Sequence, residues 1–82
     1  MVGYVIGCEA FGKVKYVRYT DDYTLVDFVD DAESATCFND KNIDNEYNNI
    51  VKIVSNGFYN IQRVFIHRLV YVHEFVRETY IG

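Results

Sequence analysis

The first twenty residues hold two short runs rich in Val, Ile and Tyr, at residues 3–8 and 13–20. Residues 9–12, which end in Gly, separate them. Two β-rich runs joined by a few residues that include Gly are typical of a β-hairpin. In the second run aromatic and aliphatic side chains fall on both parities. The alternation therefore predicts two strands without choosing which face belongs to the core.

A third β-rich run follows at residues 24–29, after the acidic pair Asp21-Asp22. Asp favours turns because its side chain bonds to nearby backbone groups. Hydrophobic and polar residues alternate in this run. We expect a third strand, with Val26 and Phe28 facing the core.

The segment after this strand carries a helix-start pattern. Asp30 and Glu33 have the spacing of a capping box, with Asp in place of the usual Ser or Thr. Ala32 and Ala35 favour helical structure. We expect one short helical turn that ends near Phe38.

The longest helical pattern lies at residues 40–56. Its apolar residues recur three and four positions apart, which places them on one side of a helix that lies on a sheet. Asn39 or Asp40 can cap its start. Asn56-Gly57 supplies a stop, because Gly adopts the left-handed conformation without a side-chain penalty. The predicted inward stripe is Ile43, Tyr47, Ile50, Val51 and Val54.

The C-terminal part is β-rich again, from residue 59 to residue 76. One long bent strand or two strands fit its alternation. The stretch contains no Pro and no clear turn dipeptide, which favours one continuous strand. A helix over 69–80 is a further option, and residues 69–82 have no assigned structure at this point. Together the elements predict an α+β fold, a small antiparallel sheet with one main helix packed on it in ββ(β)αβ order.

The composition agrees with a folded chain. Half of the 82 residues are apolar and 17% are aromatic, too many for a disordered chain. The length suits a single domain over residues 1–82. No apolar stretch approaches the roughly 20 residues that cross a bilayer, and two cysteines, Cys8 and Cys37, are too few for a disulfide framework. We expect a soluble cytoplasmic protein whose two cysteines are reduced and buried.

The net charge of -4 hides an uneven distribution. Nine of the twelve acidic residues lie in residues 21–46, where Lys41 is the only base, so this acidic window carries -8 by counting. We interpret the window, together with Tyr19 and Tyr23, as a contact face for a basic protein partner. A solvated run of turns and helix caps is the alternative interpretation. The acids are Asp21, Asp22, Asp27, Asp30, Asp31, Glu33, Asp40, Asp44 and Glu46.

Basic residues outside the window are fewer and fall in separate segments. Lys13, Lys15 and Arg18, with Arg63 and Arg68, would form only a small positive face. Direct DNA or RNA binding is therefore disfavoured. The eight tyrosines exceed what so small a core can hold, so we expect some of them at the surface, where Tyr suits binding interfaces.

The motifs of catalysis and metal binding are incomplete. Residues 7–14 match the start of a phosphate-binding loop, but Val14 occupies the position of the Ser or Thr that binds magnesium. A predicted strand also follows where that loop needs a helix. The two cysteines and two histidines lack the close spacing of zinc ligands. We expect no catalytic site, no metal and no cofactor.

The order of elements resembles that of small accessory proteins of tailed bacteriophages. Those chains often begin with a Tyr-Val-Ile strand and a Lys-Tyr-Val strand, and they carry an Asp-Ala-x-x-Ala-x-x-Phe segment before the helix. The likeness covers about residues 3–67. In this chain the matching pieces are Tyr4-Val5-Ile6, Lys15-Tyr16-Val17 and Asp31-Ala32-Glu33-Ser34-Ala35-Thr36-Cys37-Phe38.

This resemblance implies an early phage protein that binds a host protein in the host cytoplasm and inhibits or redirects it. Restriction, toxin or CRISPR effectors are among the implied partners, and the acidic window would suit a basic nucleic-acid groove by imitating phosphates. Two other classes stay open. One is an assembly module that builds a homodimer or larger oligomer through strand edges. The other is a small nucleic-acid binder that stacks bases on its tyrosines.

Overall fold

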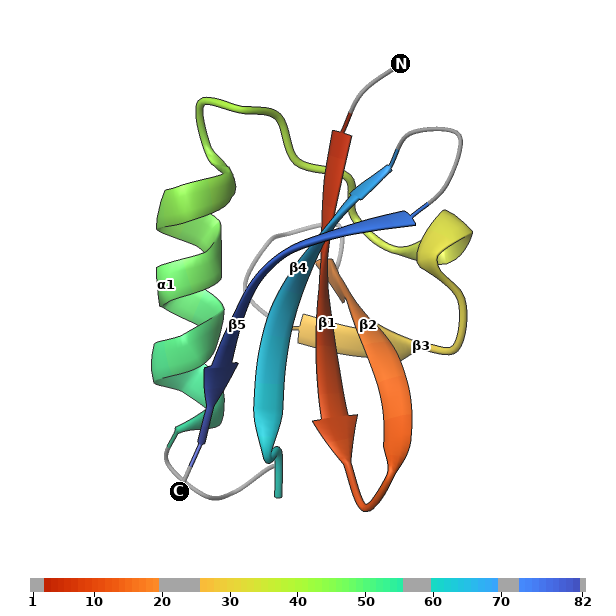
Figure 1. Ribbon diagram of the computed structural model, residues 1–82, viewed down its shortest axis with the longest axis vertical. Helices are drawn as coiled ribbons and strands as arrows, with labels where there is room; N and C mark the ends of the chain where they lie inside the picture. Colours follow the sequence, from red (N-terminus) through yellow and green to blue (C-terminus); the bar gives the residue numbers. More distant parts are fainter. Residues whose placement is uncertain (1–2, 20–25, 56–59, 70–72, 82) are drawn as a thin grey trace.

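The computed structural model describes residues 3–19, 26–55, 60–69 and 73–81. Over these residues the chain forms five strands, one short 3-10 helix and one α-helix (Figure 1). The predicted α+β class, a small antiparallel sheet with one main helix, is confirmed. In chain order the elements are β1 (Gly3–Ala10), β2 (Lys13–Tyr19), β3 (Val26–Val29), η1 (Ala32–Ser34), α1 (Ile43–Val54), β4 (Arg63–Leu69) and β5 (His73–Tyr80).

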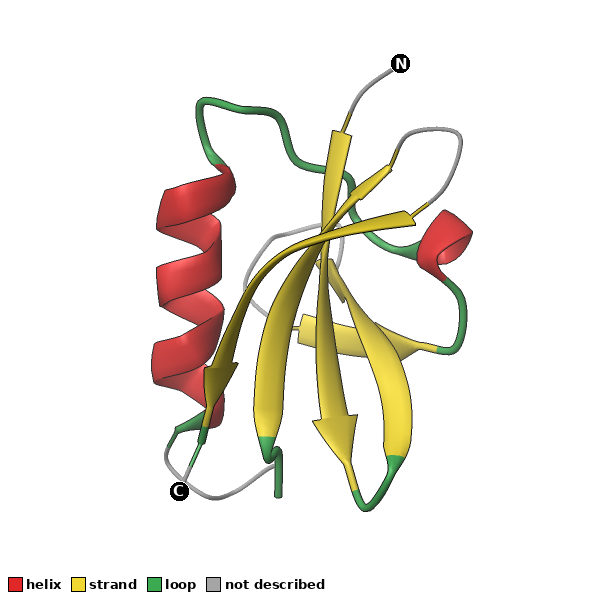
Figure 2. Cartoon of the chain, viewed as in Figure 1, coloured by secondary structure: helices red, strands yellow, loops and turns green. Residues whose placement is uncertain are grey.

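The sheet has the order β3-β2-β1-β4-β5, and all neighbouring strands are antiparallel. β1 is therefore the central strand, with the hairpin partner β2 on one side and the distant β4 on the other. The helix lies along one side of the twisted sheet (Figure 2). This arrangement buries an apolar helix stripe and an apolar sheet face against each other.

The predicted hairpin is confirmed, with a tighter turn than residues 9–12. β1 continues to Ala10, which pairs with Lys13, so only Phe11 and Gly12 form the turn. Both have positive φ angles, 55° and 79°, the combination of a type I′ turn, whose twist matches that of the strands. The third strand is also confirmed over Val26–Val29, and Phe28 packs against the core as predicted. Residues 24 and 25 and the side chain of Val26, also predicted to face the core, lie outside the described part of the chain.

A short extended segment, residues 36–38, lies between β1 and β2 where the two strands diverge. The backbone N–H of Thr36 donates to the carbonyl of Val17 (3.1 Å). Phe38 and Tyr4 exchange two backbone hydrogen bonds of 2.8 and 2.9 Å. The segment thereby satisfies backbone groups of both strands, which would otherwise lack a partner in the interior.

The helical turn before this segment differs from the prediction in its cap and in its end. Asp31 is the N-cap of η1, and its carboxylate accepts a hydrogen bond from Ser34 N–H (2.8 Å). The expected pairing of Asp30 with Glu33 as a capping box is wrong, as is an end near Phe38. The turn stops early because the following residues are extended by their pairing with β1 and β2.

Helix α1 is shorter than the predicted 40–56. Before it, the Asn39 side chain accepts hydrogen bonds from the N–H groups of Lys41 (2.9 Å) and Asn42 (3.0 Å), so it organises the preceding turn. The N-cap is Asn42, and neither Asn39 nor Asp40 takes that position. The predicted stop at residues 56–57 lies outside the described residues.

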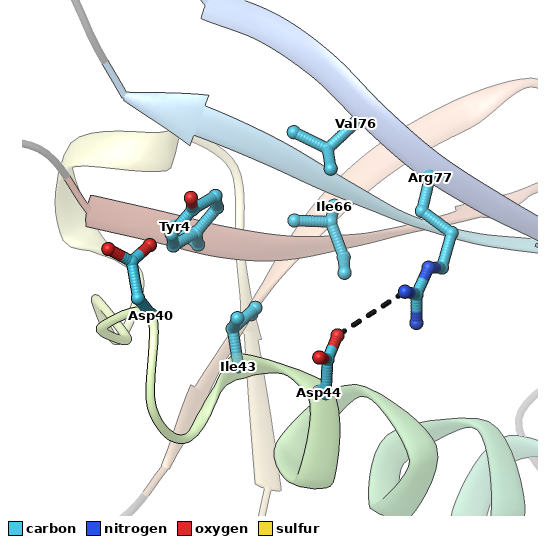
Figure 3. Close-up of a pocket in the computed structure, with 7 residues that line it drawn as sticks. All are labelled: Tyr4, Asp40, Ile43, Asp44, Ile66, Val76 and Arg77. Atoms are coloured by element: carbon cyan, nitrogen blue, oxygen red, sulfur yellow. Dashed lines mark ion pairs between the residues drawn. The ribbon is translucent and has the colours of Figure 1, made fainter.

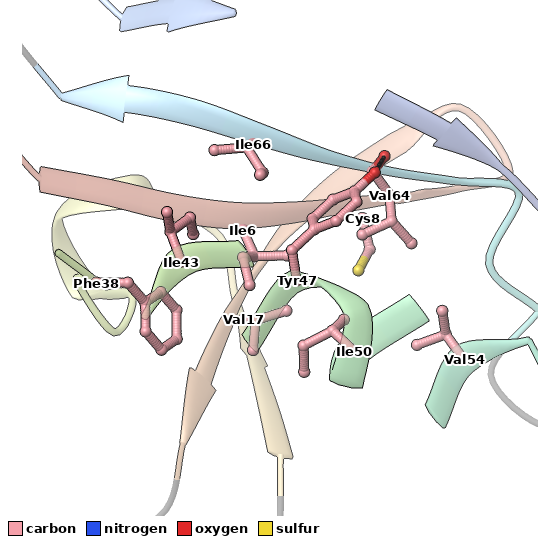
Figure 4. Packing of buried hydrophobic residues seen from close by; sticks show 10 residues of the cluster. All are labelled: Ile6, Cys8, Val17, Phe38, Ile43, Tyr47, Ile50, Val54, Val64 and Ile66. Atoms are coloured by element: carbon pink, nitrogen blue, oxygen red, sulfur yellow. Dashed lines mark hydrogen bonds between the residues drawn. The ribbon is translucent and has the colours of Figure 1, made fainter. Parts of the chain in front are cut away.

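The predicted helix stripe is confirmed as the centre of the core (Figure 4). Ile43, Tyr47, Ile50 and Val54 are buried, and Val51 packs partly against the cluster. They meet apolar side chains of three strands. The sheet residues of this core cluster are Ile6 and Cys8 from β1, Val17 from β2, and Val64 and Ile66 from β4.

The C-terminal β-rich stretch forms two strands, so the interpretation as one continuous strand is wrong, as is the helical option over 69–80. Leu69 pairs with His73, and the two strands run antiparallel from there to Arg63 and Tyr80. β5 pairs with β4 along its length. A helix in place of β5 would leave the backbone groups on that side of β4 without hydrogen-bond partners. A register shift between Ile66 and His67 of β4 marks a β-bulge in this pair.

Candidate protein-binding surfaces

The described acids of the window fall into two groups. Asp21, Asp22 and Tyr23 lie outside the described residues. Figure 1 places η1 and α1 on opposite sides of the sheet, so the window divides between these two places. The β3–η1 acidic group contains Asp27, Asp30, Asp31 and Glu33, and the α1 acidic group contains Asp40, Asp44 and Glu46.

Three of these acids form ion pairs and still remain exposed. Asp30 pairs with Lys15 and keeps 82% of its side-chain surface exposed. Asp27 pairs with Arg18 at 2.7 Å and keeps 53%, and Asp44 pairs with Arg77 at 3.3 Å and keeps 68%. Exposed pairs of this kind contribute little to stability. Because each of the three side chains keeps more than half of its surface exposed, its carboxylate stays accessible to cations of a partner.

Two acids of the β3–η1 group are held in the charged form by local hydrogen bonds. Arg18 and the backbone N–H of Phe28 lower the pKa of Asp27 below its usual value. Hydrogen bonds from Ser34 lower the pKa of Asp31 in the same way. Asp27 and Asp31 therefore keep their negative charge in mildly acidic solution.

Asp31, Glu33 and Asp40 are the exposed acids of the window that no ion pair engages within the described part of the chain. Glu33 lies in η1 and Asp40 precedes α1. The β3–η1 acidic group thus presents two carboxylates whose charge no cation offsets, Asp31 and Glu33, and the α1 acidic group presents one, Asp40.

Tyr19 and Glu46 have an internal role in the described structure. The Tyr19 hydroxyl donates to the Glu46 carboxylate, and the Tyr19 ring meets Phe38 edge-on, with centroids 5.6 Å apart. Burial and the neighbouring Glu46 carboxylate raise the pKa of Tyr19. Both side chains are half-buried, so they link β2 to α1 and offer a partner less surface than the other acids do.

A pocket of about 190 Å³ lies where the start of α1 faces β1, β4 and β5 (Figure 3). Apolar side chains of the helix and the sheet line its interior, and charged side chains stand at its rim. Its lining residues are Tyr4, Asp40, Ile43, Asp44, Ile66, Val76 and Arg77.

Two contacts hold Arg77 at one end of this pocket. Its guanidinium pairs with Asp44, as Figure 3 shows, and lies 5.6 Å from the centroid of the Tyr47 ring. The charges of Arg77 and Asp44 offset each other. Asp40 is then the carboxylate that gives the pocket its net negative charge.

Sequence reasoning named the two acids of this pocket but not Val76 or Arg77. Asp44 and Arg77 are far apart in the sequence, and the β4–β5 pairing brings Arg77 opposite Ile66. The extra residue of the bulge, Val76, lines the same pocket. Nothing local in the sequence marks this meeting of the C-terminal strand with the start of the helix.

The sheet face opposite the helix is closed at its centre by Phe65, which is 1% exposed. Its ring lies across Gly7, where an added Cβ would stand 2.3 Å from a ring carbon. The Arg63 guanidinium lies 4.8 Å from the ring centroid, and the rings of Tyr16 and His67 flank it at 6.2 and 4.6 Å. The central aromatic ring is therefore covered, which does not favour stacking of nucleic-acid bases on it.

The bases of the predicted small positive face are partly matched by acids. Lys15 and Arg18 pair with the β3–η1 acidic group. Arg63 contacts Glu9 and Glu78, each at 3.0 Å, and Glu78 raises the pKa of Arg63. These contacts do not favour direct nucleic-acid binding.

Large apolar side chains are exposed at a few described positions. Tyr80 is 72% exposed, which agrees with the expectation that some tyrosines lie at the surface. Phe11 is 76% exposed in the hairpin turn, and Val14 and Val76 are 37% and 48% exposed. By contrast, Tyr47 is buried. Its hydroxyl donates to the Val64 carbonyl (2.9 Å) and forms a second hydrogen bond with the Thr79 hydroxyl (2.6 Å).

Both cysteines are free thiols, but only Cys8 is buried. The expectation that both are buried is wrong for Cys37, which is exposed although its sulfur lies close to Gly3. Burial raises the pKa of the Cys8 thiol to about 12. Among the residues described, no three His, Cys, Asp or Glu side chains gather as metal ligands would.

Comparison of the chain with protein-family models, curated proteins and solved structures found no match. Within the described residues, no helix has both the length and the apolar character needed to cross a membrane. The function is therefore inferred from the contacts and exposed side chains of the protein itself.

Proposed function

We propose that this protein is a non-catalytic binding protein that attaches to a basic surface of another protein through its exposed carboxylates. The observation that supports this proposal is the accessibility of the acids. Six of the seven described acids of the window are exposed, and the three in ion pairs keep more than half of their side-chain surface. Exposed charges of one sign speed association with an oppositely charged partner and help to select it.

The partner in this proposal is a host protein with a basic nucleic-acid-binding groove, such as a defence effector, in the host cytoplasm. The resemblance to small accessory proteins of tailed bacteriophages supplies this class of partner. The exposed carboxylates supply the chemistry, because a groove built for phosphates attracts fixed negative charges. Binding there would block the groove and inhibit or redirect the host protein.

Homodimer formation through a strand edge is the second candidate function. β5 is an outer strand of the described sheet, and its Val76 and Tyr80 are exposed. Against this candidate stand a bulge and the charged Arg77 and Glu78 in the same strand, devices that discourage pairing between sheet edges. Light scattering after size-exclusion chromatography separates the two functions, since only the second requires a dimer.

The proposal is tested by neutralising each acidic group separately. The variants are D30N/E33Q and D40N/D44N, and each changes the net charge by two units without reversing an ion pair. The control is F11K/V14K, which makes the same change in net charge in the hairpin turn and at the start of β2. Each protein is immobilised, exposed to a bacterial lysate with and without nuclease treatment, and washed with rising salt. The retained protein is then purified and its affinity for each variant measured.

We expect the retained protein to leave at least one neutralised variant at lower salt than the original protein or the control. Screening of exposed charges beyond about 8 Å at physiological ionic strength is the reason for the salt dependence. Equal affinity and equal salt dependence for all four proteins would refute the proposal. Loss of capture only after nuclease treatment would indicate a nucleic-acid ligand instead.

A further inference from the structure

The pocket at the start of α1 combines three chemical features. Ile43 and Ile66 provide an apolar floor, and Val76 forms one wall (Figure 3). The ring of Tyr4 closes another side. Asp40 lies at the rim, exposed and without an ion-pair partner among the described residues. An apolar cavity beside one uncompensated carboxylate matches a ligand that is apolar along its length and positive at its end.

We infer that this pocket receives the side chain of a single Lys or Arg from the partner protein. The aliphatic stem would lie on Ile43, Ile66 and Val76, and the cationic group would meet Asp40 beside the Tyr4 ring. Long basic side chains bury their methylene groups on apolar surface while the charged end stays near water. Aromatic faces attract cations as well.

The arrangement of Arg77 explains why the incoming charge goes to Asp40. Arg77 already pairs with Asp44 and lies over the Tyr47 ring, so both its charge and its position are fixed at the far end of the pocket. A second cation is repelled from that end and attracted to the opposite rim. The volume of about 190 Å³ suits one side chain rather than a peptide segment.

This inference rests on the proposed function, because it specifies how one of the two acidic groups contacts the basic partner. It adds a requirement for shape to the requirement for charge. The two can be separated, since filling the pocket with an apolar side chain leaves the net charge unchanged.

The experiment uses two matched pairs of variants. V76F fills the pocket at a half-exposed strand position, and V14F makes the same substitution on β2, at a position that does not line the pocket. D40N removes the rim carboxylate, and E33Q removes one carboxylate from the other acidic group. Each protein is titrated with acetylated, amidated pentalysine and pentaarginine peptides while backbone amide shifts are followed by NMR. Thermal unfolding confirms that all four variants fold.

We expect peptide-induced shifts at Tyr4, Ile43 and Val76, and an affinity about fivefold lower for V76F and D40N than for V14F and E33Q. Shifts spread evenly over both acidic groups, with D40N indistinguishable from E33Q, would overturn the pocket inference. That result leaves the proposed function intact if D40N/D44N still weakens capture of the protein partner. If the added ring of V76F turns outward, the comparison of D40N with E33Q still decides.

Discussion

Only glycine fits at position 7, because the Phe65 ring lies directly across the backbone of Gly7. An added Cβ would approach the ring to 2.3 Å, so Gly7→Ala must displace either the ring or β1. We expect a loss of about 1–3 kcal/mol in the free energy of unfolding, measured by urea denaturation. In a Phe65→Leu background the same change should cost much less, since contacting residues are not additive. Equal costs in both backgrounds would contradict the contact.

The two thiols should differ sharply in reactivity. Cys8 is buried with its pKa raised to about 12, whereas Cys37 is exposed. Since the thiolate is the reactive form, iodoacetamide at pH 8 should label only Cys37 in the folded protein and both cysteines after unfolding. Mass spectrometry of digested protein identifies the site. Labelling of a folded Cys37→Ser variant at the rate of the unfolded chain would contradict the burial of Cys8.

Single residues also show where local patterns fail. The choice of Asp31 over Asp30 as the cap depends on where β3 ends, and the sequence gives two adjacent Asp residues with equal capping ability. The exposure of Cys37 likewise follows from the extended segment after η1, in which the neighbouring residues Thr36 and Phe38 bond to the backbones of β2 and β1. Residue type alone favours burial of Cys. Both errors come from tertiary pairing that local rules do not contain.

At the scale of elements, the helix stripe makes the strongest stability prediction. Ile50 is fully buried at the centre of the interface between α1 and the sheet. Ile50→Ala should lower the free energy of unfolding by about 2–5 kcal/mol, from lost burial and the cavity left behind. The exposed Asn48 on the same helix serves as control, and Asn48→Ala should change stability by less than about 0.5 kcal/mol. Similar denaturation midpoints for the two variants would reject this core.

The contact between Tyr19 of β2 and Glu46 of α1 should appear in alkaline solution. The folded structure raises the pKa of Tyr19 above its ordinary value of 10.0, so folding favours the neutral phenol. This stabilisation is complete below pH 10 and is lost as the pH rises through the folded-state pKa. Tyr19→Phe should therefore reduce the steepness of the stability loss above pH 10, as measured by urea denaturation at several pH values. An unchanged slope would show that Tyr19 does not carry this linkage.

The elements differ in how well the sequence predicts them. The stripe of α1 repeats over more than three turns, so its period identifies a helix and its buried face without tertiary information. β4 and β5 lack such a signal, because apolar residues occur on both parities and no Gly or Pro marks their junction. The stretch forms two strands because β4 pairs with β1 on one side and with β5 on the other. The pocket was unpredictable for the same reason, since Val76 and Arg77 reach it through that pairing.

At the scale of the molecule, one core connects all the main elements. The stripe of α1 contacts three strands, and Tyr47 joins the helix to β4 and β5 through hydrogen bonds to Val64 and Thr79. Neither acidic group therefore sits on a separately folding part, and a contact made at one group acts on the whole molecule.

The protein should consequently unfold in one cooperative step. Tyrosine fluorescence reports the surroundings of Tyr47 and the other rings, whereas far-UV circular dichroism reports the helix and the sheet, so the two curves in urea should coincide. Thr79→Val tests the argument at the edge of the sheet, because it removes one hydrogen bond of Tyr47 and leaves the helix stripe intact. We expect it to lower stability by about 0.5–1.5 kcal/mol and to move both curves together. If only the fluorescence curve moves, β5 opens independently of the core, and the pocket that Val76 and Arg77 complete would open with it.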